Sequence, residues 1–319
     1  MKTDKKIIQD VREYIAQQAQ DWINRHAPYY MKQNADYNKL SPSEFIKTKQ
    51  KFRLGKKHPF EHQDNNENFS ARSQKFETKN IKEIIQENKK LVILGDPGFG
   101  KTTLLNYLAF EYAKDESKPI PILLELKNYR HRYSLEVYIK NYTTIDIQRH
   151  KEENFIFLLD GFNELSYEEQ SELYIDIDKL VFDFPESSFI ISSRKVSYPS
   201  GLSDWITCEI LELENIERRY LYELLGEKKT DTVLKSIKDT VLFDIVNIPL
   251  FLNFIIELYN AGRSIPKTEG GLLNEIFRYK YLDGFTLIGK ERVKYVSMLK
   301  NLGGSMFCLQ IISKLAYNI

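Results

Sequence analysis

The chain has 319 residues, of which 42% are hydrophobic and 29% charged, a balance typical of globular proteins that excludes a largely disordered chain. No apolar stretch approaches the roughly 18 residues that a membrane span requires, and no apolar run follows the basic N-terminus as it would in a secretion signal. We therefore expect a cytoplasmic protein in which Cys208 and Cys308 are reduced thiols.

Charge is distributed unevenly along the chain. The formal net charge is +1, yet residues 1–90 hold 19 Lys and Arg against 12 Asp and Glu. The near-zero total argues against a protein that coats nucleic acid along its whole length. Basic residues interleaved with aromatic ones could contact a nucleic-acid backbone locally, although a solvated charge run is the commoner explanation. This basic run consists of Lys47, Lys49, Lys51, Arg53, Lys56 and Lys57, near Phe52 and Phe60.

The N-terminal part of the chain combines one helical pattern with a long polar segment. Apolar residues at helical spacing over residues 5–24 predict an amphipathic helix that packs on its own domain. Residues 28–78 are polar and contain several prolines, which predicts a linker or a loosely packed region. We assign residues 1–78 to an N-terminal helical region that serves as an effector or a linker.

From residue 79 onward, short apolar runs alternate with helical patterns. This alternation predicts a parallel sheet buried on both faces by helices, an α/β fold. The expected strands are residues 91–94, 121–126, 155–159, 188–192 and 207–210. Only helical periodicity follows. The sequence thus predicts an α/β domain over residues 79–214 and an all-helical subdomain over residues 215–319.

One glycine-rich segment fits the pattern G-x-x-x-x-G-K-[ST] between a predicted strand and a predicted helix. Glycines let backbone N–H groups surround a phosphate, and the helix N-terminus adds partial positive charge. We expect Lys101 to bridge the β- and γ-phosphates, Thr102 to ligate Mg²⁺, and Thr103 to lie near the α-phosphate. The alternative is an ordinary glycine-rich turn. The segment is Gly95, Asp96, Pro97, Gly98, Phe99, Gly100, Lys101 and Thr102.

An acidic residue ends the third apolar run. Asp160 follows five apolar residues, and a carboxylate at the end of a buried strand can hold Mg²⁺ directly or through water. Gly161 permits a close approach of the backbone to a ligand. Glu164 lies four residues after Asp160 and could polarise the attacking water. The alternatives are that Asp160 caps the next segment and that Glu164 is a solvated loop acid.

These segments together resemble the NACHT family of STAND P-loop ATPases, which act in signal transduction and include relatives in bacterial antiviral defence. The resemblance rests on GDPGFGKTTLL, IPILLELKNY, FIFLLDGFNEL and FIISSR, in that order. It implies a P-loop NTPase sheet with ATP or ADP and Mg²⁺ as cofactors, and a nucleotide-controlled switch that hydrolyses ATP slowly. It also implies self-association, or a sensor or effector protein as partner.

The resemblance assigns two further residues and shows two departures. Arg194 matches a position where the family reads the γ-phosphate, and Pro249 matches a proline that packs against the base. The alternatives are a surface arginine and a helix that starts with proline. Asn163 stands where the family has an acid, which puts efficient hydrolysis in doubt because an amide cannot take a proton as a carboxylate can. Lys195 stands where the family usually has proline.

Other functions remain open from the sequence. A P-loop also occurs in phosphotransferases and in ATPases that depend on nucleic acid, and Asn163 is consistent with a nucleotide-binding scaffold that does not hydrolyse. Residues 312–319 resemble only the beginning of the winged-helix domain that follows in similar proteins.

Overall fold

The computed structural model describes residues 2–26, 52–55, 78–79, 81–130, 132–211, 225 and 227–279. The chain divides into two compact units, Met1–Glu212 and Leu213–Ile319. The first unit contains a β-sheet, and the second is helical in its described part.

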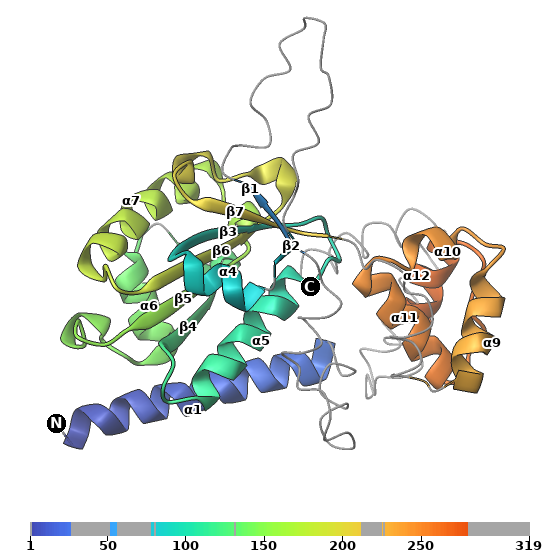
Figure 1. Cartoon of the computed structure of the whole chain (residues 1–319), viewed down its shortest axis with the longest axis horizontal. Helices are drawn as coiled ribbons and strands as arrows, with labels where there is room; N and C mark the ends of the chain where they lie inside the picture. Colours follow the sequence, from blue (N-terminus) through green and yellow to red (C-terminus); the bar gives the residue numbers. More distant parts are fainter. Residues whose placement is uncertain are drawn as a thin grey trace, which may run out of the picture. The chain divides into compact units, whose positions relative to one another are not determined.

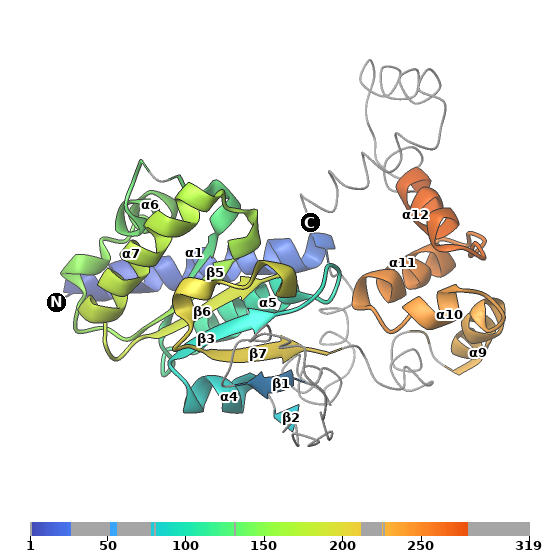
Figure 2. The ribbon, with the colours of Figure 1, turned by 90° about the horizontal axis from the view of Figure 1, so that it is seen from above.

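The first unit is built on a seven-stranded sheet with the strand order β2-β1-β7-β3-β6-β5-β4 (Figure 2). Neighbouring strands from β7 to β4 all run parallel, which confirms the predicted α/β fold with a parallel sheet. These five strands are β3 (Lys90–Leu94), β4 (Ile120–Glu125), β5 (Phe155–Asp160), β6 (Ser188–Ser193) and β7 (Ile206–Ile210).

Two short strands that the sequence did not predict extend one edge of the sheet. Strand β1 (Phe52–Gly55) pairs antiparallel with β7, and β2 (Thr78–Lys79) pairs antiparallel with β1. Both strands lie in the polar region expected to be irregular. Segments of two to four residues are too short to show the period-2 alternation by which a strand is recognised from sequence.

The central strands form the core of the unit because their side chains are apolar on both faces. Ile93, Leu124 and Leu158 are completely buried, as expected for parallel strands covered on both sides. An aromatic cluster continues the core, with the rings of Phe157 and Phe189 stacked at 4.8 Å between centroids. The covering helices are α4 (Ile81–Glu87), α5 (Lys101–Lys114), α6 (Leu135–Thr143) and α7 (Tyr167–Asp183).

Two of these helices begin with N–H groups that the chain itself satisfies. The Ser166 side chain accepts from the backbone of Glu169, whose carboxylate accepts from the Ser166 N–H, and this capping box starts α7. At the start of α6, the Asp176 carboxylate accepts a hydrogen bond from the backbone N–H of Leu135 at 2.5 Å. Capping of this kind satisfies donors that have no partner inside the helix.

The predicted N-terminal helix is present as α1 (Lys2–His26) and packs along α5 (Figure 1). Val11, Ile15, Ala19 and Ile23 are buried on it. They follow one another every four residues, so they form a single face of the helix. This face covers α5, whose opposite side lies on the sheet.

A buried arginine ties α1 to the end of α5. Arg12 is 5% exposed, and its guanidinium donates to the carbonyl oxygens of Tyr112 at 2.7 Å, Asp115 at 3.2 Å and Lys118 at 2.6 Å. Burial lowers the pKa of Arg12, although Glu116 and Asp115 oppose this effect. A guanidinium suits this position because it is a planar cation with several donors beside the negative end of a helix dipole.

The second unit is helical in the part of the chain that the structure describes. It contains α9 (Glu227–Ile237), α10 (Leu242–Ile245), α11 (Pro249–Asn260) and α12 (Glu269–Phe277). Helix α11 contributes more buried apolar side chains than any other of these four helices, among them Leu252, Ile255, Ile256 and Leu258. A helical region after the sheet is what the sequence predicted.

Several predictions fall on residues outside the described ranges. They concern the lysines of the basic run, Cys308 and the beginning of a winged-helix domain at residues 312–319; only the backbone of Phe52 and Arg53 in β1 is described. Of the helices that are described, none has both the length and the apolar character needed to cross a bilayer.

Candidate functional site

The glycine-rich segment forms the turn between β3 and α5. Gly98 and Gly100 have φ angles of 82° and 88°, a left-handed conformation that side chains with a Cβ rarely adopt. Gly100 is also the N-cap of α5, and no side chain caps this helix. The first N–H groups of α5 therefore differ from those of α6 and α7, because they lack a partner from a side chain at the cap and are suited to bind an anion.

Lys101 lies at the first position of α5 and folds back over the turn. Its ammonium group donates to the carbonyl oxygens of Gly95 at 2.7 Å and Asp96 at 3.1 Å. Burial lowers its pKa to about 8, and Arg194 acts in the same direction, whereas Asp160 and Asp96 oppose the change. The ammonium group is thus hydrogen-bonded to main-chain carbonyls. A phosphate is a stronger acceptor and could replace them as its partner.

Asp160 ends β5 and is held by hydroxyl groups. Ser192 on β6 donates to the Asp160 carboxylate and accepts a hydrogen bond from the Gly161 N–H at 2.9 Å. Thr102 also forms a side-chain hydrogen bond with Asp160. Burial raises the pKa of Asp160, while the bonds to Ser192 and Thr102 and the charge of Lys101 act against it. The Thr102 hydroxyl and the Asp160 carboxylate supply oxygen ligands of the kind that Mg²⁺ prefers. Phosphate oxygens would complete the coordination of the ion.

The turn after Asp160 brings the remaining predicted residues together. Gly161 has a φ of 86°, and a Cβ there would lie 3.2 Å from the Glu164 side chain. Partial burial raises the pKa of Glu164, as does the nearby Asp160, whereas Lys127 and Arg194 lower it. The Asn163 side-chain oxygen accepts from the backbone N–H of Arg194 at 3.1 Å, so the amide links the turn to the end of β6.

The predicted residues of the first unit thus gather at one edge of the sheet. The carboxyl ends of β3, β5 and β6 lie at or shortly before Lys101, Thr102, Asp160, Glu164 and Arg194. The charges of Asp160, Glu164 and Arg194 all affect the pKa of Lys101. Ligands of open parallel sheets bind at this edge.

Two predicted nucleotide contacts remain untested by this geometry. Thr103 lies in the first turn of α5, and its contact with an α-phosphate stays a prediction. Pro249 is the first residue of α11, as expected for a helix that starts with proline, and it belongs to the second unit. Its contact with a base therefore stays a prediction.

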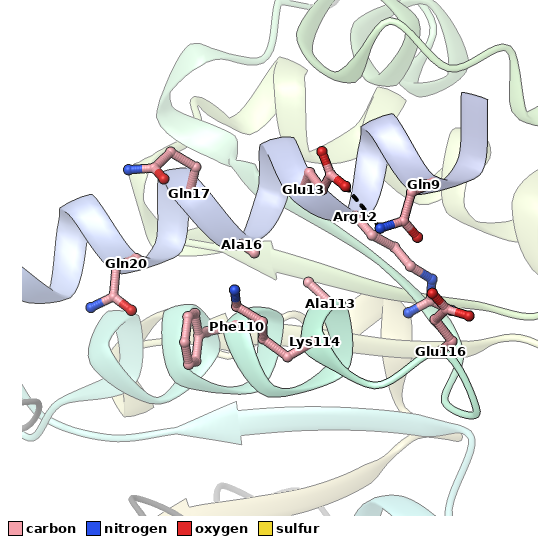
Figure 3. Close-up of a pocket in the computed structure, with 10 residues that line it drawn as sticks. All are labelled: Gln9, Arg12, Glu13, Ala16, Gln17, Gln20, Phe110, Ala113, Lys114 and Glu116. Atoms are coloured by element: carbon pink, nitrogen blue, oxygen red, sulfur yellow. Dashed lines mark hydrogen bonds between the residues drawn. The ribbon is translucent and has the colours of Figure 1, made fainter. Parts of the chain in front are cut away.

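A groove of about 430 Å³ lies elsewhere on the first unit, between α1 and α5 (Figure 3). It is lined by the carboxamide side chains of Gln9, Gln17 and Gln20, and by Phe110 and Lys114 of α5. Phe110 is nine residues from Lys101, about 13 Å along the helix. The groove is thus separate from the P-loop and contains none of its residues.

Three residues around the predicted ones have contacts that the sequence did not indicate. Ser192 bridges Asp160 and Gly161, and a hydroxyl residue directly after the apolar run at residues 189–191 was an available signal. Glu125 ends β4 directly opposite Asp160 and raises the pKa of both Asp160 and Glu164. Lys195 forms ion pairs with Asp96 at 3.1 Å and Glu209 at 2.5 Å, which no local pattern could have revealed.

The fold and the turn between β3 and α5 together define a P-loop NTPase domain, which is a nucleotide-binding class of domain. Residues 74–220 match the family model described as Novel STAND NTPase 3. The predicted resemblance to STAND P-loop NTPases is therefore confirmed over these residues. The match does not distinguish the NACHT family within that class, so the narrower assignment stays a prediction.

Among solved structures, the chain is similar to AMPPCP-bound DnaA from Aquifex aeolicus, with 19% identity and a TM-score of 0.30. The similarity covers 70% of this chain and 65% of that one. No curated protein matches the chain.

Proposed function

We propose that the protein is an ATP-controlled signal-transduction switch that hydrolyses ATP slowly with Mg²⁺, in the manner of the NACHT proteins that its motifs resemble. The observation that carries the proposal is the convergence of Lys101, Thr102, Asp160, Glu164 and Arg194 at the carboxyl edge of the parallel sheet. Each of these side chains has a role that phosphoryl transfer requires.

The P-loop supports binding of the phosphates. The turn from Gly95 to Gly100 presents backbone N–H groups at the N-terminus of α5, and Lys101 supplies a cation that donates to two main-chain carbonyls. Lys101 would exchange these carbonyls for β- and γ-phosphate oxygens, which form stronger, charge-assisted hydrogen bonds.

Thr102 and Asp160 are the residues that would hold the metal. They are hydrogen-bonded to each other, and Ser192 fixes the carboxylate from the other side. A bound Mg²⁺ would neutralise charge on the phosphates during transfer. Burial raises the pKa of Asp160, and Lys101 and the two hydroxyl groups oppose this rise; a bound Mg²⁺ would itself favour the carboxylate form.

Glu164 and Arg194 would act at the γ-phosphate. Glu164 has a raised pKa, which strengthens a carboxylate as a general base as long as it stays ionised at neutral pH. Arg194 follows β6 and interacts electrostatically with both Lys101 and Glu164. Loss of the γ-phosphate would change what Arg194 pairs with, and such a change can reorient an attached segment.

The wider role is proposed on the resemblance alone. Defence signalling, an adenine rather than guanine base, a cytoplasmic location and a protein partner or self-association are properties of the proteins that share these motifs. Pro249 is the proposed contact for the base.

A second candidate function is a nucleotide-binding scaffold that does not hydrolyse ATP. The Asn163 side chain favours it, because its oxygen is already bonded to the Arg194 N–H and an amide cannot accept a proton from water. The two candidates share nucleotide binding and differ only in chemistry.

Single-turnover hydrolysis of ATP in the presence and absence of Mg²⁺ separates the two candidates. We expect slow, Mg²⁺-dependent release of phosphate that Glu164→Gln reduces by about a hundredfold, with ATP affinity retained. An unchanged rate in Glu164→Gln would reject Glu164 as the base. Complete absence of turnover in the native chain would favour the scaffold.

Asn163→Asp sharpens this test. A carboxylate can accept the Arg194 N–H as the amide does, so the turn should keep its shape while gaining a second acid. We expect a faster single turnover, by about tenfold. No increase would show that Asn163 is not what limits hydrolysis.

A further inference from the structure

Lys195 follows Arg194 and pairs with carboxylates from two other parts of the sheet edge. Its ammonium group lies 3.1 Å from an oxygen of Asp96 in the P-loop and 2.5 Å from an oxygen of Glu209 on β7. All three side chains are between 24% and 47% exposed, so the cluster is partly shielded from solvent.

The strand register shows what this side chain crosses. Leu94, the last residue of β3, is opposite Ser193 of β6 on one side and Glu209 of β7 on the other. Lys195 comes two residues after Ser193, so its contact with Glu209 crosses the end of β3, about 10 Å in two strand spacings. The P-loop begins at this point.

Residues 95 and 96 are consequently held by several contacts. The Gly95 N–H donates to the Ser193 carbonyl at 3.3 Å, and the Asp96 carbonyl accepts from Lys101 at 3.1 Å. Lys195 holds the Asp96 carboxylate. The short segment after β6 thus contains both Arg194 and Lys195, and Lys195 forms an ion pair with Asp96 of the P-loop.

The charges at this point create a problem for an anionic ligand. Asp96 and Glu209 are two carboxylates beside a turn suited to phosphates. Their negative charges would repel a bound phosphate, because electrostatic repulsion acts over several ångströms. Burial alone would lower the pKa of Lys195, but its bonds to Glu209 and Asp96 outweigh burial and raise it. Lys195 therefore stays cationic at neutral pH and offsets the acids.

We propose that Lys195 is a positioning residue of the nucleotide site, which neutralises Asp96 and fixes the start of the P-loop so that it can accept a nucleoside polyphosphate. It acts through Asp96 and does not need to touch the nucleotide. This inference rests on the proposed nucleotide binding and adds a residue that lies outside the glycine-rich pattern.

The test is a double-mutant cycle of Lys195→Met and Asp96→Asn, read by equilibrium titration of the full chain with Mg·ADP and with the Mg complex of the β,γ-methylene analogue of ATP. Lys195→Met should weaken binding of both probes about tenfold at low salt, equivalent to about 1.4 kcal/mol. In the Asp96→Asn background the same Lys195 substitution should weaken binding less than about threefold, because the carboxylate that Lys195 neutralises is already gone.

Lys89→Met is the matched control. Lys89 pairs with Glu186 at 2.7 Å near the opposite, amino end of β6, so the substitution removes the same charge from the chain far from the P-loop. It should leave affinity unchanged. The loss in Lys195→Met should shrink in about 0.5 M salt, because salt screens partly exposed charges.

Two results would overturn the inference. Native affinity in Lys195→Met would show that the ion pairs do not serve the ligand. A loss of the same size in the Asp96→Asn background would show that Lys195 acts through the fold rather than through Asp96; thermal unfolding of each variant checks this directly. If the native chain binds neither probe, the proposed function itself fails, which is a separate outcome.

Discussion

The two ends of α5 satisfy their backbone groups in opposite ways. At the C-terminal end, buried Arg12 from α1 donates to the carbonyl oxygens of Tyr112 and Asp115, and also to that of Lys118 in the loop that follows. At the N-terminal end, Gly100 provides no side-chain cap, and the nearby cation, Lys101, bonds to carbonyls of its own loop. Carbonyl groups at the C-terminal end are thus satisfied by a side chain of the protein itself. The N–H groups at the N-terminal end have no side-chain cap and are suited to bind an anionic ligand.

The starts of α6 and α7 make the same point. Both are closed by side chains of this chain, Asp176 and the pair Ser166 and Glu169. Among the three α-helix N-caps that the structure describes in this unit, those of α6 and α7 are closed by side chains, and that of α5 lies where the glycine-rich turn, Asp160 and Arg194 meet.

Lys101→Ala should have the largest effect. Removing the cation from the open end should weaken ATP binding by about a thousandfold, measured by equilibrium titration. Lys114→Ala, at the other end of the same helix, should change affinity less than twofold. Comparable losses in both variants would contradict the division of roles between the two ends.

Arg12→Met should act on stability instead. It leaves the carbonyls of Tyr112, Asp115 and Lys118 without their charged donor in a buried setting, which should lower the free energy of unfolding by about 3 kcal/mol. Denaturant titration measures this loss. Arg25→Met, on the exposed side of α1, should cost less than about 0.5 kcal/mol, and an equal cost would refute the capping role.

Affinity for ATP should fall at alkaline pH. The pKa of Lys101 is lowered to about 8, and bound phosphates should raise it again. Below that pH the lysine is charged with and without nucleotide, so affinity is constant; above it, affinity should fall up to about tenfold per pH unit. Constant affinity between about pH 7 and 9.5 would contradict contact between Lys101 and the phosphates.

The same shift should change stability in the opposite direction. The unfolded lysine, with a pKa near 10.5, binds more protons than the folded one between about pH 8 and 10.5. This group's contribution to the stability of the nucleotide-free protein should therefore rise with pH in that window. Denaturant titrations of the native chain and Lys101→Met, compared at the two pH limits, isolate the contribution.

Ser192→Ala should have the smallest effect. It removes the hydroxyl that bridges Asp160 and the Gly161 N–H, at a cost of about 1–2 kcal/mol in stability. The pKa of Asp160 should rise further, so that half-maximal hydrolysis requires more Mg²⁺. Ser171→Ala, whose hydroxyl bonds to a carbonyl on the exposed side of α7, serves as the control. An unchanged Mg²⁺ requirement would exclude Ser192 from positioning the carboxylate.

The sequence predicted what depends on local pattern. Strands β3 to β7 are apolar runs, and the glycine-rich turn has a fixed spacing, so both could be recognised without knowing the strand order. The same holds for Asp160 at the end of β5. Contacts that join distant segments could not be predicted in this way.

Arg12 and Lys195 illustrate the limit. Arg12 is one of several charged residues on an amphipathic helix, and its burial depends on where α5 ends relative to α1. Lys195 contacts Glu209 because the strand order places β6 and β7 on either side of β3, so that residues at the ends of these two strands come close together. Strand β1 was missed for a related reason, since its four residues gain their strand conformation by pairing with β7.

The central claim is that the turn between β3 and α5 binds a nucleoside polyphosphate. The most direct measurement is the identity and amount of nucleotide released from the natively purified full chain, determined by mass spectrometry beside the Lys101→Ala variant. The account predicts close to one adenine nucleotide per native chain and none in the variant. A native chain that carries no nucleotide and has no measurable affinity for ATP, ADP, GTP or GDP would contradict it.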